Sequence, residues 1–339
     1  LQNKGQFHIL IIVNVYMKSD IGSVKNNFLQ WHFPDESSIL LLLKTIQKQE
    51  ILMSKQIQGP RFSGGSRYVL DEELARIVNV TMALEMPLLL KGEPGTGKTM
   101  LAHAIAESLK MPLIVLNVKS SMKLVDALYQ YDTLTRLNDS RFGDSRRDVS
   151  NIEEYIKMGK IGQAFVSPVR TVLLIDEIDK ADTDFQDDML DVLDQMQFDI
   201  IEIDKRVGAV HRPVIVITSN AKKDLSDPFL GRCNFHHIAF PDHEMMRRIV
   251  DIHFPGLNGK LAAACIEAFY RLRDLRGIEK KPATRELINW IRALMADRDF
   301  DLADLQKEKM PYLGVLFKKS GDLKSAEHQL QSGQYGRTK

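Results

Sequence analysis

The sequence predicts an α/β fold, in which a parallel sheet covered by helices on both faces is followed by a small domain of helices alone. Five short apolar runs of strand length recur between residues 87 and 240, and segments with helical spacing separate most of them. This alternation is typical of parallel sheets that are buried on both faces. After Pro241 and Asp242, the apolar residues keep only a helical period. We therefore expect an α/β domain at residues 54–241 and a small all-α lid domain at residues 242–317.

The elements of the α/β domain can be assigned in order. A loop rich in Gly, Ser and Arg covers residues 58–68, and a helix with Asp71 as its N-cap is expected at 71–86. The predicted strands are apolar runs that end in polar or turn residues, at 87–90, 113–118, 171–176, 214–219 and 236–240. Turn residues predict a hairpin at 200–210, before the fourth of these runs.

The helical domain is predicted from the spacing of its apolar residues. Helices are expected at 243–253, at 257–272 and from Thr284 onward. Residues 318–339 lose the apolar period, which predicts a polar, mobile tail.

Composition limits the classes of function. The charge is balanced, with 46 Lys and Arg against 45 Asp and Glu, so no overall basic field favours nucleic-acid binding. Cys233 and Cys265 are too far apart for a metal or redox motif, and so few cysteines indicate a reducing, cytoplasmic compartment. No apolar run reaches the length of about 18 residues that a membrane span needs, so we expect no membrane partner.

Residues 1–53 are expected to be an extension outside both domains. The chain begins at Leu1, and its apolar runs at 7–16 and 39–43 are short. No small-residue cleavage site follows the first run, which argues against a secretory signal. Our interpretation is that Met53 is the natural start and that the residues before it are upstream sequence or a poorly ordered extension.

A phosphate-binding loop is predicted between the first strand and the helix that begins near Met100. The stretch GEPGTGKT has the spacing of a P-loop and consists of Gly92, Glu93, Pro94, Gly95, Thr96, Gly97, Lys98 and Thr99. Its glycines let backbone N–H groups point at a phosphate, and the helix that follows adds a partial positive charge. Lys98 supplies a cation for the β- and γ-phosphates, and the Thr99 hydroxyl can ligate Mg²⁺. A glycine-rich turn without function would not need Lys98 and Thr99 together. We therefore predict a site for ATP and Mg²⁺, with Met100 as a further nucleotide-binding residue.

Polar residues at the ends of two later strands extend this site. Asp176 and Glu177 end the third strand, which in a doubly wound sheet places them beside the P-loop. We expect Asp176 to hold Mg²⁺ and Glu177 to deprotonate the attacking water. Asn220 ends the fourth strand, expected between the other two, where its amide can bind that water or the γ-phosphate.

Four stretches together resemble an AAA+ ATPase. They are GEPGTGKT, LLIDEIDKAD, VIVITSN and PFLGRC, in this order. A more detailed likeness to the MoxR branch lies in residues 119–139, 164–169 and 281–287. The resemblance runs from about Arg61 to Arg298 and implies a P-loop NTPase fold of the AAA+ type with a helical lid.

The resemblance also implies roles for two arginines, one at the interface between subunits and one in the helical lid. Arg232 matches the arginine finger, which reaches the γ-phosphate bound by the neighbouring subunit. Arg285 matches the sensor 2 position, where many relatives carry a small polar residue, and Thr284 would cap its helix. The implied assembly is a ring of identical subunits, expected to be a hexamer. A partner protein with a von Willebrand factor A domain is implied as well.

Two segments allow more than one interpretation. Five aspartates follow a helical spacing and form either a solvated face or a dock for the next subunit: Asp184, Asp187, Asp188, Asp191 and Asp194. Residues 124–147 are too long for an ordinary loop. The resemblance implies an inserted hairpin directed at the central pore, and Tyr129 and Tyr131 either pack in the core or contact a client.

The sequence thus predicts a ring-forming ATPase of MoxR type that couples ATP hydrolysis to the remodelling or maturation of a protein client. A monomeric P-loop kinase or NTPase is one alternative, and a nucleic-acid motor or loader is another. A scaffold that binds ATP without turnover is disfavoured by the Asp176–Glu177 pair. The client and the subunit number stay open, and adenine contacts are expected in residues 59–70.

Overall fold

The computed structural model describes residues 61–66, 68–143, 147–220, 225–306 and 310–332. All of them belong to one unit that spans residues 60–339. The predicted extension at 1–53 and the proposed start at Met53 lie outside the described residues, as does part of the segment expected to contact adenine.

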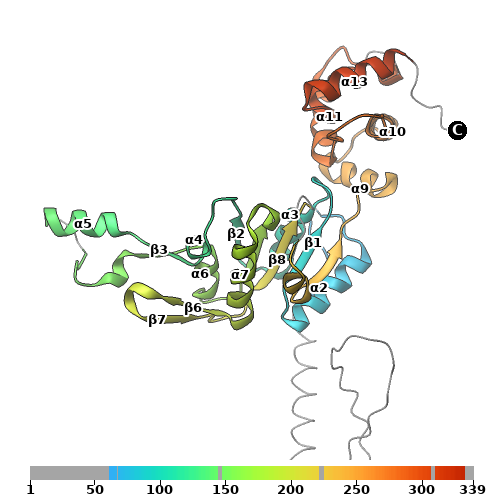
Figure 1. Ribbon diagram of the computed structural model, residues 1–339. Coiled ribbons are helices and arrows are strands. Elements are labelled where there is room, and N and C mark those ends of the chain that lie inside the picture. The colour runs from blue at the N-terminus through green and yellow to red at the C-terminus, as the bar shows by residue number, and fades with distance from the viewer. Residues whose placement is uncertain (1–60, 67, 144–146, 221–224, 307–309, 333–339) are drawn as a thin grey trace, which may run out of the picture. The chain divides into compact units, whose positions relative to one another are not determined.

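Five strands form the central sheet. Their bounds are β1 Leu88–Lys91, β2 Leu113–Asn117, β5 Val172–Asp176, β8 Val214–Ser219 and β9 Asn234–His237. They are hydrogen-bonded in the order β2-β5-β8-β1-β9, and every neighbouring pair is parallel (Figure 1). This sheet confirms the predicted fold class, although β9 begins before the apolar run expected there. β8 lies between β1 and β5, as expected from the sequence.

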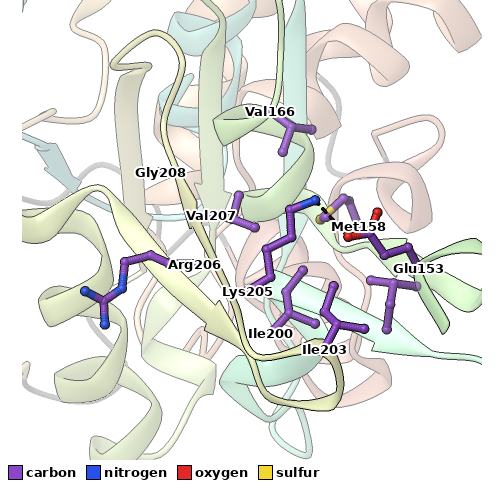
Figure 2. Close-up of a pocket in the computed structure, with 10 residues that line it drawn as sticks. Glu153, Met158, Val166, Ile200, Ile203, Lys205, Arg206, Val207 and Gly208 are labelled. Carbon is purple, nitrogen blue, oxygen red and sulfur yellow. Dashed lines mark hydrogen bonds and ion pairs between the residues drawn. The ribbon is translucent and has the colours of Figure 1, made fainter. Parts of the chain in front are cut away.

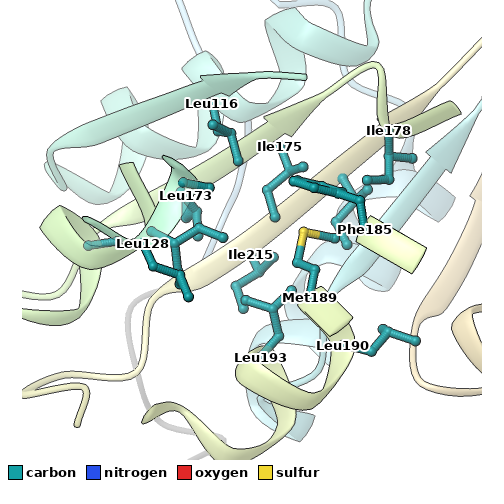
Figure 3. Packing of buried hydrophobic residues seen from close by; sticks show 14 of the residues in the cluster. Leu116, Leu128, Leu173, Ile175, Ile178, Phe185, Met189, Leu190, Leu193 and Ile215 are labelled. Atoms are coloured by element: carbon teal, nitrogen blue, oxygen red, sulfur yellow. The ribbon is translucent and has the colours of Figure 1, made fainter. Parts of the chain in front are cut away.

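Helices cover both faces of the sheet because both faces are apolar. Alternate strand residues such as Leu88, Leu174 and Val216 pack with α2 (Glu72–Leu84) and α3 (Lys98–Leu109). The residues between them, such as Leu173 and Ile215, face the other way. These pack with α4 (Leu124–Leu128), α6 (Lys160–Phe165) and α7 (Thr183–Gln195), and Figure 3 shows part of this cluster. Asp71 caps α2 as predicted, since its side chain accepts a hydrogen bond from the Glu73 N–H.

The inserted segment forms a second, smaller sheet. β3 (Tyr129–Tyr131) pairs antiparallel with β4 (Ile156–Met158), and α5 (Thr133–Phe142) and η1 (Ile152–Tyr155) lie between them in sequence. Tyr129 is only 3% exposed, and its ring stacks on Phe198 with centroids 6.2 Å apart. Its hydroxyl accepts a hydrogen bond from the Ile201 N–H at 3.2 Å. For Tyr129, therefore, core packing is the correct interpretation.

The predicted hairpin at 200–210 is present, but it is shifted to residues 197–208. β6 (Gln197–Ile200) and β7 (Lys205–Gly208) pair antiparallel around η3 (Ile201–Ile203), and Asp204 makes the turn with a φ of 48°.

The helical region holds more structure than the sequence predicted. α9 (His243–His253), α10 (Gly259–Arg273) and α11 (Thr284–Ala296) correspond to the three expected helices. η4 (Leu302–Gln306), α12 (Leu313–Leu316) and α13 (Ser320–Gln331) follow. The expectation of a polar, mobile tail at 318–339 is wrong for α13, because Ala326 and Leu330 are fully buried in the helical core. Within the described part of the chain, no helix combines the length and the hydropathy that crossing a membrane requires.

Candidate nucleotide-binding site

The P-loop connects β1 to α3 and encloses the amine of Lys98. Gly97 is the N-cap of α3 and adopts a φ of 94°, a left-handed conformation that residues with a Cβ seldom tolerate. The Lys98 Nζ donates hydrogen bonds to the carbonyl oxygens of Gly92 and Glu93, both at 2.8 Å. The Thr96 hydroxyl donates to the same Glu93 oxygen at 2.9 Å. The loop therefore holds a cation at its centre beside the start of a helix, which is the arrangement that binds phosphate.

Lys98 is buried, with 5% of its surface exposed. Burial lowers the pKa of its amine below the ordinary value, because the charged form loses hydration. The negative charges of Asp176, Asp179 and Glu177 oppose this effect. A bound phosphate would oppose it further, so the site is suited to an anionic ligand.

A hydroxyl and carboxylate cluster lies beside the P-loop. The Thr99 Oγ1 donates to the Asp176 Oδ1 at 3.0 Å, and the Thr218 Oγ1 donates to the same oxygen at 2.6 Å. Hard oxygen donors of this kind fit Mg²⁺, which takes few protein ligands and completes its shell with phosphate oxygens and water. The described residues contain no cluster of three or more His, Cys, Asp or Glu side chains able to bind a metal ion.

Glu177 follows β5 in a strained conformation, with a φ of 61°. Its N–H donates to the Thr218 hydroxyl at 2.9 Å, and its Oε1 accepts a hydrogen bond from the Asn220 Nδ2 at 2.9 Å. Its other carboxylate oxygen pairs with Lys180, and hydrogen bonding to Glu177 raises the pKa of Lys180. The Asn220 N–H in turn donates to the Asp179 Oδ1 at 3.2 Å. Asn220, just after β8, and Lys180 of η2 (Ile178–Lys180) thus fix the carboxylate of Glu177 from two sides.

Thr218 was not predicted as a site residue. It belongs to β8 and lies two positions before Asn220, where the apolar run 214–217 gives way to hydroxyl residues. Its spacing from Asn220 is the signal that could have identified it, since alternate residues of a strand share a face.

Arg232 lies immediately after α8 (Asp227–Gly231). Its Nε forms an ion pair with the Asp194 Oδ2 at 2.6 Å, and the Arg232 side chain is 41% exposed. In the described single chain, the guanidinium of Arg232 thus binds α7 rather than the P-loop.

Arg285 is exposed in the first turn of α11. The expected cap is wrong, because the N-cap residue is Ala283 and not Thr284. The Ala283 N–H donates to the Glu286 Oε2 at 3.1 Å, whereas the buried Thr284 Oγ1 has no hydrogen-bond partner. Arg273 of α10 does contact the P-loop, since it pairs with Glu93, and the sequence did not single it out.

A separate cavity of about 330 Å³ lies away from the P-loop residues. Residues of η1, β4, β6, η3 and β7 line it, including Met158, Ile200 and Val207, together with Val166 just after α6 (Figure 2). The Lys205 Nζ and the Glu153 Oε1, 3.0 Å apart, form an ion pair at its wall. None of the predicted site residues belongs to it.

Comparison with protein families identifies the central part of the chain. Residues 88–241 match the family described as ATPase family associated with various cellular activities (AAA). This segment is an AAA ATPase domain and holds every predicted site residue except Arg285. No curated protein matches the chain in sequence.

Two solved structures of NtrX from Brucella abortus also match. The structure in complex with ADP has a TM-score of 0.47 and 15% identity, over 88% of this chain and 68% of that chain. The second structure has a TM-score of 0.45 and 14% identity. The match covers 78% of this chain and 58% of the NtrX chain.

Proposed function

We propose that this chain, with its AAA ATPase domain at residues 88–241, is a MoxR-type AAA+ ATPase that hydrolyses ATP to remodel or mature a client protein. The observation that carries the proposal is the position of Glu177. Its carboxylate is held by Asn220 at the end of the strand next to β5, and the adjacent Asp176 contacts Thr99 of the P-loop.

The phosphate cradle supports nucleotide binding. The P-loop N–H groups and the Lys98 amine would hold the β- and γ-phosphates. Thr99 and Asp176 would hold Mg²⁺, which when bound neutralises charge on the phosphates. Thr218 keeps the Asp176 carboxylate in place through its hydrogen bond at 2.6 Å.

Hydrolysis requires a base that can reach a water molecule next to the γ-phosphate. Glu177 would accept the proton from that water, and the Asn220 amide would orient the carboxylate or the water. Lys180 pairs with the second carboxylate oxygen, and the carboxylate keeps further lone pairs that can accept the proton of the water. The water oxygen then forms a bond to the γ-phosphorus while the bond from that phosphorus to the β,γ-bridging oxygen breaks, so that ADP leaves and inorganic phosphate is formed.

The proposed ring and its partners rest on the resemblance in sequence. Arg232 would act as the arginine finger on the nucleotide of the neighbouring subunit, and Arg285 would act as sensor 2. The subunits would form a homo-oligomeric ring, expected to be a hexamer. A protein with a von Willebrand factor A domain is the proposed partner, alongside the client.

A pair of variants tests the division of roles. Glu177→Gln should keep ATP affinity within a few-fold and lower turnover by about 10²–10⁴, the usual effect of removing a positioned base. Lys98→Ala should lose ATP binding. Glu73→Gln, in the exposed first turn of α2, is the matched control and should keep full turnover. An equal loss of affinity in Glu177→Gln and Lys98→Ala would contradict these assignments.

Because Glu177→Gln keeps ATP bound, it also serves as a trap for the client. A protein that is retained by this variant with ATP, and not by Lys98→Ala, is expected to be the client. Stimulation of the ATPase rate by DNA would instead favour a nucleic-acid motor or loader.

A further inference from the structure

A buried arginine joins the P-loop to the helical region. Arg273 ends α10 and is 6% exposed. Its guanidinium pairs with the Glu93 carboxylate and donates a hydrogen bond to the Pro282 carbonyl oxygen at 2.6 Å. The carbon at the centre of the guanidinium lies 3.5 Å from the centroid of the Phe240 ring. Arg273 is therefore held on three sides, by one charge, one carbonyl and one aromatic ring.

Glu93 places a negative charge inside a loop that binds phosphate. Its side chain is 57% exposed, and its backbone oxygen accepts hydrogen bonds from Lys98 and Thr96. Like charges repel over several ångströms, and the repulsion is strong where water is partly excluded. A free carboxylate at this position would weaken the binding of any nucleotide phosphate.

The ion pair removes this net charge. The same guanidinium also contacts the residue before α11, since it donates a hydrogen bond to Pro282, which immediately precedes Ala283, the N-cap of α11. A Cβ added at Gly95 would lie 2.6 Å from the Ala283 Cβ, so the P-loop and the start of α11 are in close contact. The P-loop therefore touches the helical region both through the Glu93–Arg273 ion pair and through the close approach of Gly95 to Ala283.

We propose that Arg273 is a positioning residue for the nucleotide, which acts through Glu93 by neutralising that carboxylate and so allows the P-loop to bind the phosphates of ATP and ADP. The inference rests on the proposed nucleotide site. It does not require Arg273 to touch the phosphates.

The charge balance gives an order of affinities. With the Glu93–Arg273 pair intact, the pair adds no net charge near the phosphates. Arg273→Met leaves one negative charge, Glu93→Gln leaves one positive charge, and the double variant again leaves none. Affinity should therefore be highest for Glu93→Gln, intermediate and similar for the unmodified chain and the double variant, and lowest for Arg273→Met.

The experiment measures the Kd of ADP by calorimetry, which requires no hydrolysis. Arg273→Met should raise the Kd by about tenfold, as expected when one unit charge is exposed near a phosphate. The double variant should restore the Kd to within about threefold of the unmodified chain, and added salt should reduce the differences. Arg276→Met, an exposed arginine just after α10, removes the same charge elsewhere and should leave the Kd unchanged.

A double variant that binds as weakly as Arg273→Met would overturn the inference, because neutralisation could then not explain the loss. If Arg273→Met fails to fold by circular dichroism, Glu93→Gln alone decides. Tighter ADP binding by that variant, reduced by salt, supports the inference, and unchanged or weaker binding overturns it. Failure of the unmodified chain to bind ADP or ATP would refute the proposed function itself, which separates the two outcomes.

Discussion

Replacing Arg232 tests whether the active site is completed between subunits. In the single chain, Arg232 pairs with Asp194 through side chains that are 41% and 45% exposed. An arginine finger would have to leave this pair to reach the phosphate of the neighbouring subunit. The cost of leaving it decides whether such a role is physically reasonable.

The free energy lost when the Arg232–Asp194 pair breaks is small compared with the stabilisation of the transition state by an arginine finger. An exposed ion pair stabilises a protein by about 0–1 kcal/mol. An arginine finger raises kcat by about 10³–10⁵, which corresponds to about 4–7 kcal/mol of transition-state stabilisation. We therefore expect Arg232→Ala to bind ATP normally and to turn over at least about 10³-fold more slowly. Asp194→Asn, which only releases the arginine, should keep its activity.

Mixed rings provide the decisive assay. Neither Arg232→Ala nor Lys98→Ala can form a complete site alone, but an Arg232→Ala subunit can receive the finger of a Lys98→Ala neighbour. In a head-to-tail ring mixed at equal amounts, about one quarter of the interfaces would be competent, whatever the subunit number. The ATPase rate per subunit of the unmodified chain should also rise with protein concentration as rings form.

Two results would refute this reasoning. One is the absence of any rescue while light scattering confirms mixed rings, which would favour a monomeric kinase or NTPase. The other is a similar loss of turnover in Arg76→Ala, a control that breaks the exposed pair with Glu72 on α2.

The remaining predictions concern three residues. Asn220→Ala should lower kcat by about 10²-fold, as expected when a catalytic group is misplaced, and stopped-flow ATP binding should stay unchanged; weakened binding would count against a role in orientation. Leu330→Ala should lower the free energy of unfolding in urea by about 2–5 kcal/mol, because Leu330 is fully buried, whereas the exposed Glu327→Ala should have little effect; an equal response would contradict the packing of α13. ADP affinity should fall as pH rises through the lowered pKa of Lys98, because only the charged amine attracts phosphate and burial disfavours that form; a Kd that stays constant from neutral pH to about pH 10 would contradict this, since an ordinary lysine has a pKa of about 10.4.

The sequence by itself determined the sheet and the elements that place the P-loop. Strands buried on both faces are continuous apolar runs, so each can be recognised locally, and the parallel order follows from the helices between them. The carboxyl ends of such strands meet at one edge, which is why Asp176 and Asn220 could be predicted to lie near Thr99. In the structure, Asp176 contacts Thr99, and Asn220 binds the neighbouring Glu177.

Only the tertiary structure decided which side chains meet across long separations. Arg273 pairs with Glu93, 180 positions away, and Thr218 binds Asp176, 42 positions away. No local pattern records such a contact, because it depends on how separate elements pack. The same holds for α13, where burial of Ala326 and Leu330 against other helices stabilises a helix whose own sequence is mostly polar. Local periodicity thus determined the elements, and packing determined their charged and buried partners.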